Sequence, residues 1–257
     1  MCSGIRTDNL FAALRTIHDV GAEGVVVSGD LAGKPMDQIL QRSAVPPVLG
    51  RLRARTTTDE SRLLQRGAPQ AYIAWSMTYD QIFTRPGDHE LETDGLSVDE
   101  VVTRLRQHLG QWPNPASVPD NRDAPCSSAS GPAVLICGPT AVGKSAVAMQ
   151  LFMDSLADGV PTAYLDLAQI GFVHGQLDVV ETRARNLAEM STNFRAQGAQ
   201  RLIFSGDISH PSELRRYQRA LPHVNLQIYA LTASTATLIE RAQLRGAGMT
   251  ELPGDEL

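Results

Sequence analysis

The chain has 257 residues, 42% of them hydrophobic, which suits a buried core of one large or two small domains. No run approaches the roughly 18 consecutive apolar residues of a membrane-spanning helix, and residues 1–10 lack a secretory signal pattern, so we expect a cytoplasmic protein with no membrane partner. A formal net charge of −5 argues against a surface built to bind nucleic acid.

The N-terminal part, residues 1–110, alternates predicted helices with short strands. Apolar runs bounded by turn residues predict strands at Gly24–Ser28 and Val48–Arg53. A further strand is predicted at His89–Glu92, followed by a helix at Ser97–Leu109. No phosphate-binding sequence occurs in this part, so we expect it to be non-catalytic.

A proline- and serine-rich segment at residues 111–132 has no apolar periodicity and is typical of a linker. The C-terminal part, residues 133–257, follows it. Its predicted strands are Ala133–Cys137, Thr162–Leu167, Arg201–Ser205 and Asn225–Ala230. Strands that alternate with helices predict an α/β fold with a mainly parallel sheet and helices on both faces.

The two parts share an internal repeat. Residues 9–31 align without gaps on residues 186–208, each residue with the one 177 positions later, and seven of these 23 positions are identical. We interpret the N-terminal part as a partial second copy of the later half of the C-terminal domain. Chance convergence of two amphipathic helix–strand units is the alternative.

The copies are incomplete in complementary ways, and two arrangements follow. The chain is either a tandem pair of domains clipped at both ends, or a permuted arrangement in which residues 67–109 complete the C-terminal domain. In the second case the strand at His89–Glu92 covers the edge that the fourth strand, near Ala230, otherwise leaves unpaired.

The strand Ala133–Cys137 leads into the motif G-x-x-x-x-G-K-[ST], and a helix at Ala146–Leu156 follows. This context identifies a Walker A phosphate loop. Backbone amides of such a loop surround the phosphates, and the helix N-terminus adds its positive dipole end. The predicted nucleotide-binding residues are Gly138, Thr140, Ala141, Val142, Gly143, Lys144 and Ser145.

Two side chains of the loop have specific expected roles. Lys144 is expected to reach the β- and γ-phosphates of ATP, and the Ser145 hydroxyl to coordinate the accompanying Mg²⁺. Of the 23 basic residues only Lys34 and Lys144 are lysine. A ligand-free glycine-rich turn is the alternative, but a chain so biased to arginine would place arginine in an indifferent turn.

The loop resembles that of the small-molecule and nucleotide kinases. Its sequence, Gly-Pro-Thr-Ala-Val-Gly-Lys-Ser, is also similar to the corresponding loop of the tRNA dimethylallyltransferases. The latter carry an Asp-Ser-x-Gln-Val-Tyr motif after the second strand, which this chain does not have. Residues 163–172 instead resemble a group of actinobacterial P-loop kinase-like proteins with Asp-Leu-Asp-Gln-Ile-Gly at this place. The resemblance covers most of residues 133–257 and implies a P-loop NTPase fold that transfers the γ-phosphoryl group of ATP to a small molecule.

The chain departs from this pattern at Ala168, where that group has its second aspartate. One carboxylate that would orient a substrate hydroxyl is missing, so a catalytically degenerate nucleotide-binding module is the alternative to an active kinase. Asp166 remains at the end of its strand as a substrate anchor or base. A solvated strand-end carboxylate is its alternative interpretation.

Three more charged residues are candidates. Asp207 is either a Walker B-like carboxylate near Mg²⁺ or a cap of the next helix. We favour the cap, because Asp30 has the equivalent place in the copy without a phosphate loop. Arg241 and Arg245 lie one helical turn apart and correspond to lid arginines that neutralise the transferred phosphoryl group, or else to a solvated helix face.

Overall fold

The computed structural model describes residues 3–22, 25, 27, 50–65, 70, 73–74, 89–109, 128–173 and 178–246 of the chain. The chain divides into two compact units, one of Met1–Thr7 with Val26–Pro115 and one of Asp8–Val25 with Ala116–Leu257. Most of the predicted linker, residues 111–132, lies outside the described residues, and so does the predicted strand Gly24–Ser28 apart from Val25 and Val27.

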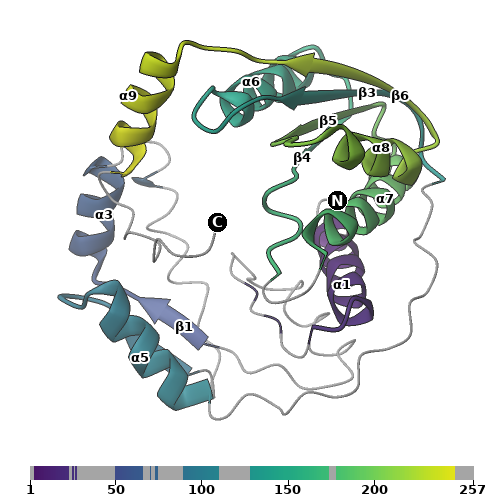
Figure 1. Cartoon of the computed structure of the whole chain (residues 1–257). Helices are drawn as coiled ribbons and strands as arrows, with labels where there is room; N and C mark the ends of the chain where they lie inside the picture. Colours follow the sequence, from purple (N-terminus) through teal and green to yellow (C-terminus); the bar gives the residue numbers. More distant parts are fainter. Residues whose placement is uncertain are drawn as a thin grey trace. The chain divides into compact units, whose positions relative to one another are not determined.

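The larger unit is built on a four-stranded parallel sheet with the strand order β4-β5-β3-β6 (Figure 1). Its strands are β3 (Ser130–Cys137), β4 (Thr162–Asp166), β5 (Arg201–Gly206) and β6 (His223–Ala230). Its helices are α6 (Lys144–Ala157), α7 (Val179–Ala196), α8 (Pro211–Ala220) and α9 (Thr235–Gly246), together with residues 8–19 of α1 (Ser3–Asp19). The predicted α/β fold with a parallel sheet is confirmed, and it is compatible with a P-loop NTPase-like fold.

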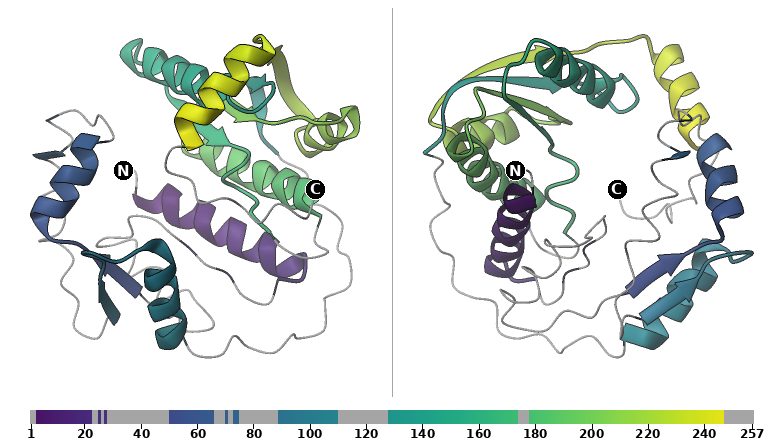
Figure 2. Two further views of the ribbon diagram at one scale, coloured as in Figure 1. Left: turned by 60° about the vertical axis from the view of Figure 1, so that its left-hand side comes forward. Right: turned by 180° about the vertical axis from the view of Figure 1, so that it is seen from behind.

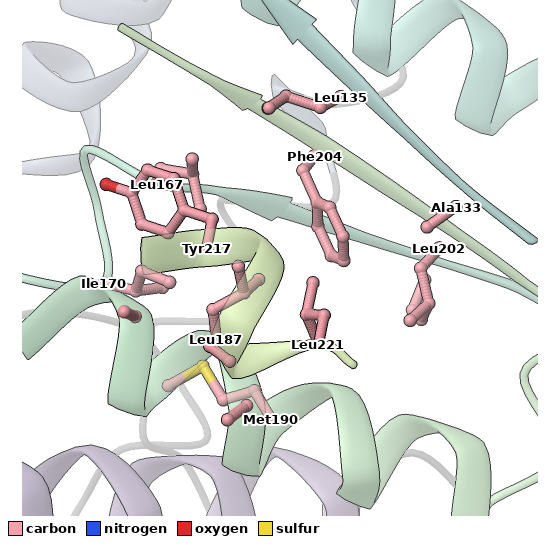
Figure 3. Close-up of a cluster of buried hydrophobic side chains, with 14 of the residues drawn as sticks. Ala133, Leu135, Leu167, Ile170, Leu187, Met190, Leu202, Phe204, Tyr217 and Leu221 are labelled. Carbon is pink, nitrogen blue, oxygen red and sulfur yellow. The ribbon is translucent and has the colours of Figure 1, made fainter. Parts of the chain in front are cut away.

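Helices cover both faces of this sheet, as predicted (Figure 1). Helix α6 packs on one face, where Ile136 and Ile203 are buried. Helices α7 and α8 pack on the other, over a cluster that includes Leu135, Phe204 and Tyr217 (Figure 3). A parallel sheet buried on both faces needs consecutive apolar side chains, which explains the apolar run Leu202–Phe204 in β5.

Strands β3 and β6 begin earlier than predicted, at Ser130 and His223. The additional residues pair with each other, Ser130 opposite His223 and Gly131 opposite Val224. This extension was not predictable from the residue types, because serine, glycine and proline are typical of turns. The two strands therefore stabilise each other in a stretch where neither has a strand-like pattern.

Helix α7 begins after Asp178, whose carboxylate accepts a hydrogen bond of 3.0 Å from the Glu181 amide. The same carboxylate forms an ion pair with the Arg216 guanidinium of α8. Burial raises the pKa of Asp178, but the hydrogen bonds from Glu181 and Arg216 outweigh it and hold this pKa below its ordinary value of 3.8. The charged carboxylate is therefore a stabilising cap that joins two helices.

Replacing Asp178 by alanine is expected to lower the free energy of unfolding by about 1–2 kcal/mol at neutral pH. Because the folded-state pKa lies below the unfolded value, this stabilisation is present above that unfolded value and is lost as the pH falls through the folded-state pKa. Denaturant unfolding of the full chain at neutral pH and at a pH below the folded-state pKa measures the loss. Asp158→Ala, at the exposed end of α6, is the control, and a loss that does not shrink at acid pH contradicts the assignment.

The smaller unit contains a parallel pair of strands, β1 (Gly50–Arg53) and β2 (His89–Glu92), with Leu52 opposite Leu91. Helices α3 (Thr56–Gln65) and α5 (Val98–Leu109) follow these strands. A capping box starts α5: Ser97 Oγ accepts from the Glu100 amide at 3.3 Å, and Glu100 Oε2 accepts from the Ser97 amide at 2.7 Å.

The strand predicted at His89–Glu92 is confirmed, and it pairs with β1 in a parallel two-stranded sheet. That this strand covers the edge of the larger sheet stays a prediction. Strands that follow each other along the chain usually lie next to each other in a sheet, as β1 and β2 do. The partial second copy stays a prediction, since most of residues 23–49 lie outside the described part of the chain. None of the described helices is long and apolar enough to cross a membrane.

Candidate functional site

The predicted site residues gather at the carboxyl ends of β3, β4 and β5. Helix α6 follows β3 on one face of the sheet, and α8 follows β5 on the other. Open α/β sheets bind ligands in the crevice between strands whose connections diverge in this way. Strands β3 and β5 are neighbours, with Cys137 opposite Gly206, so the loops that follow them lie side by side.

The loop after β3 has a backbone that few residue types adopt. Gly138, Ala141 and Gly143 have φ angles of 141°, 66° and 106°. Within the described part of the chain, Ala141 is the one non-glycine residue with a positive φ. Such a conformation costs roughly 1–2 kcal/mol and is retained where the surrounding structure enforces it, often at ligand sites. Ala141 and Val142 are buried, which anchors the loop against the sheet.

The loop ends at an uncapped helix N-terminus. Gly143 is the N-cap of α6 and, being glycine, makes no side-chain cap hydrogen bond. The Val142 amide donates weakly to the Pro139 carbonyl at 3.3 Å, and Thr140 is exposed at the rim of the loop. Amides at such an N-terminus, together with the helix dipole, attract anions.

The Lys144 side chain is held inside this loop. Its Nζ donates to the Pro139 carbonyl at 2.9 Å and lies 2.6 Å from Asp207 Oδ1. The Lys144 side chain is 11% exposed, whereas Asp207 is 49% exposed. A positive charge is therefore fixed at the mouth of the loop, and its carboxylate partner faces solvent.

The structure corrects the favoured interpretation of Asp207. Helix α8 is capped by His210, whose Nδ1 accepts from the Ser212 amide at 3.2 Å, and not by Asp207. Two residues, Ile208 and Ser209, separate Asp207 from that cap. Its ion pair with Lys144 leaves the Walker B-like role as the interpretation that the geometry favours.

The Ser145 hydroxyl donates to Asp166 Oδ2 at 2.9 Å. Asp166 is the last residue of β4, and its other oxygen accepts from the Ala168 amide at 3.0 Å. Sequence reasoning placed both residues near the site but did not foresee this contact. Asp166 is thereby oriented toward the start of α6, and the backbone at Ala168 helps to hold it there.

Arg241 of α9 also reaches the loop, since its Nη1 donates to the Val142 carbonyl at 3.1 Å. The interpretation of Arg241 as part of a solvated helix face is therefore incomplete, because its guanidinium contacts the phosphate loop. Arg245 belongs to the same helix, but its side chain lies outside the described residues.

The residues present fit a magnesium ion that arrives with a nucleotide and not a metal held by protein alone. No group of three or more histidine, cysteine or acidic side chains that would hold a metal ion occurs among the residues that the structure describes. Mg²⁺ commonly takes one or two protein oxygens and completes its shell with phosphate and water. Oxygens suited to this role are present here, in the hydroxyl of Ser145 and the carboxylates of Asp166 and Asp207.

Comparison with known proteins adds little to this geometry. No family model matches the chain, and no curated protein matches it. The crystal structure of APE1195 superposes with a TM-score of 0.35 and 17% identity over 46% of this chain and 71% of that one. The signal recognition particle receptor FtsY from Elizabethkingia anophelis gives 0.31 and 11% over 96% and 78%. Both TM-scores are below 0.5, so the interpretation of the site rests on this chain's own residues.

Proposed function

We propose that residues 138–145 bind ATP together with Mg²⁺. The observation that carries this proposal is the pairing of the loop's two functional side chains with carboxylates of the neighbouring strands: Lys144 with Asp207, and Ser145 with Asp166. A loop with positive φ angles and an uncapped helix N-terminus provides the amides for the phosphates. Bound Mg²⁺ supplies charge neutralisation between the phosphate oxygens.

We further propose that the chain is a kinase-like phosphotransferase with a small-molecule acceptor. Phosphoryl transfer depends on positioning and charge neutralisation, for which Lys144 and Arg241 are placed beside the loop. Asp166 is within reach of an acceptor hydroxyl that enters at the end of β4, where it serves as anchor or base. ATP as the donor follows from the resemblance to kinases.

A catalytically degenerate nucleotide-binding module is the second candidate, and Ala168 favours it. The Ala168 amide binds Asp166, but its methyl side chain offers no second carboxylate to an acceptor. The two candidates share the nucleotide site and differ in turnover. ATP binding without hydrolysis or transfer to any small-molecule hydroxyl supports the module.

The role of Asp207 gives a test of the nucleotide site. Calorimetric titration of the full chain with ATP is expected to show binding at least about tenfold tighter in excess Mg²⁺ than in EDTA. Asp207→Asn should reduce this ratio to a few-fold. The amide is a weaker ligand for the ion, and it also releases Lys144 to the phosphates, which favours ATP without Mg²⁺.

Asp154→Asn is the matched control, because Asp154 lies on α6 farther from the loop and bonds to Gln150. It should leave the magnesium ratio unchanged. An unchanged ratio in Asp207→Asn contradicts the Walker B-like role, and failure of the parent chain to bind ATP under either condition contradicts the proposed function.

A further inference from the structure

One polar side chain is buried inside the four-stranded sheet, close to the candidate site. Among the described residues of these strands, Ser205 of β5 is the one polar side chain that is fully buried, at 0% exposure. Its hydroxyl group is hydrogen-bonded at 2.8 Å to the hydroxyl of Tyr164 on the neighbouring strand β4. A buried hydroxyl pair gives little net stability over two apolar side chains of the same shape, so stability alone does not account for it.

The hydroxyl pair lies on the same face of the sheet as the two carboxylates of the candidate site. The Tyr164 ring packs against Phe152 of α6, and α6 covers this face whereas α7 and α8 cover the other (Figure 2). Side chains alternate along a strand, so Asp166 projects to the same side as Tyr164. Asp207 lies two residues beyond Ser205, and both carboxylates contact the first residues of α6. The hydroxyl pair therefore lies one row before the carboxylates.

Ser205 holds β4 on both sides of Asp166. In the pairing of β4 with β5 it lies directly opposite Asp166. Its hydroxyl binds Tyr164, two residues before Asp166, and its carbonyl accepts a hydrogen bond of 2.8 Å from the Leu167 amide, one residue after it. Leu167 also packs closely on Gly206, where an added Cβ would lie 2.8 Å from the Leu167 Cβ. Strand β4 is thus fixed against β5 up to the point where the carboxylates leave the sheet.

The spacing of the two carboxylates depends on this attachment. Asp166 ends β4, whereas Asp207 follows β5, and only Gly206 separates Asp207 from Ser205. Mg²⁺ requires a near-octahedral arrangement of oxygens, so carboxylates that bind it directly or through water must be held at a fixed spacing. Hydrogen bonds behind the ligands commonly supply this orientation, and their loss weakens metal binding.

We infer that the Tyr164–Ser205 pair fixes the spacing of Asp166 and Asp207, so that the oxygens of the site meet the geometry that Mg²⁺ requires. The inference rests on the proposed function, because it concerns the ion that accompanies ATP. Tyr164 and Ser205 act through the carboxylates and are positioning residues. Loss of the pair therefore weakens the contribution of Mg²⁺ to ATP binding. The contribution of the phosphate loop is preserved, because the loop is built on β3 and α6.

Calorimetric titration of the full chain with ATP, in excess Mg²⁺ and in EDTA, separates the two contributions. Tyr164→Phe removes one hydroxyl but keeps the ring against Phe152, and Ser205→Ala removes the other hydroxyl. Each should lower the ratio of the two affinities about threefold or more, while the affinity in EDTA stays within about twofold of the parent. Ser155→Ala is the matched control and should leave the ratio unchanged. It removes a buried hydroxyl, bonded to the Leu151 carbonyl, from the end of α6 that is farther from the loop.

A double variant distinguishes positioning from stability. Each single variant leaves one hydroxyl without its partner, so it should unfold at a lower denaturant concentration than the parent. The combination of Tyr164→Phe with Ser205→Ala leaves neither hydroxyl, so its stability should recover toward that of the parent. Its magnesium ratio should stay as low as in either single variant, because the same bond is lost in all three.

Two results would overturn the inference while the proposed function stands. One is an unchanged magnesium ratio in the single variants, and the other is a ratio that recovers together with stability in the double variant. A parent chain that binds no ATP in Mg²⁺ or in EDTA would overturn the proposed function as well, so the two failures are distinguishable.

Discussion

Replacing Lys144 by alanine is expected to weaken the binding of ATP by well over tenfold. In the structure the Lys144 ammonium group sits between the Pro139 carbonyl and the Asp207 carboxylate, at 2.9 and 2.6 Å. Its removal takes away the charge that faces the β- and γ-phosphates. It also leaves Asp207 without its cationic partner, so the negative Asp207 carboxylate repels the phosphates of the nucleotide.

Calorimetric titration with ATP in excess Mg²⁺ measures this loss. Lys144→Arg is the informative companion, since it keeps the charge but places a planar, longer group in a closed loop, and it should bind ATP less well than the parent. Arg201→Ala removes a positive charge from an exposed position at the start of β5 and is the matched control for net charge. Equal affinity of Lys144→Ala and the parent would falsify the assignment of the phosphate loop.

The parts of the fold that sequence predicted well are those with local causes. Strands β3 and β5 are buried on both faces, so each contains a run of apolar residues from which the strand can be predicted. The strand order was not predictable from such runs, because it depends on pairing between distant segments. The same limit applies to β2, whose sequence identified a strand but not its partner β1. The contact of α1 with α7, through Asn9 and Asn193, is likewise a long-range contact that no pattern in either helix predicted.

The candidate site divides in the same way. The spacing of glycine, lysine and serine in residues 138–145 reflects the backbone of a single loop, so the sequence alone predicts this loop. The role of Asp207 was misjudged because it depends on β5 lying next to β3, which puts Asp207 beside Lys144. A carboxylate after a glycine at the end of a buried strand was the available signal, but the same pattern is common in turns. The contacts of Asp166 with Ser145 and of Arg241 with Val142 join residues far apart in sequence.

The second large effect is expected at Gly138, the first residue of the loop. Its φ of 141° lies in the region that disfavours residues with a side chain. A Cβ placed there would lie 2.5 Å from the backbone carbonyl oxygen of Leu231, the residue that follows β6. Leu231 cannot easily move away, because its amide donates to the Cys137 carbonyl at 2.8 Å. Gly138→Ala therefore combines backbone strain with a clash against the sheet.

We expect Gly138→Ala to lower the free energy of unfolding by about 2–4 kcal/mol and to weaken ATP binding, because relief of the clash must shift the start of the loop. Gly159→Ala separates the two causes. Gly159 also has a positive φ, of 70°, but no atom lies within 4 Å of the added Cβ, so strain alone should cost about 1 kcal/mol. Its ATP affinity should equal that of the parent. Denaturant unfolding and calorimetry of the full-length variants measure both effects, and equal losses of stability at Gly138 and Gly159 would show that the contact with Leu231 does not constrain the loop.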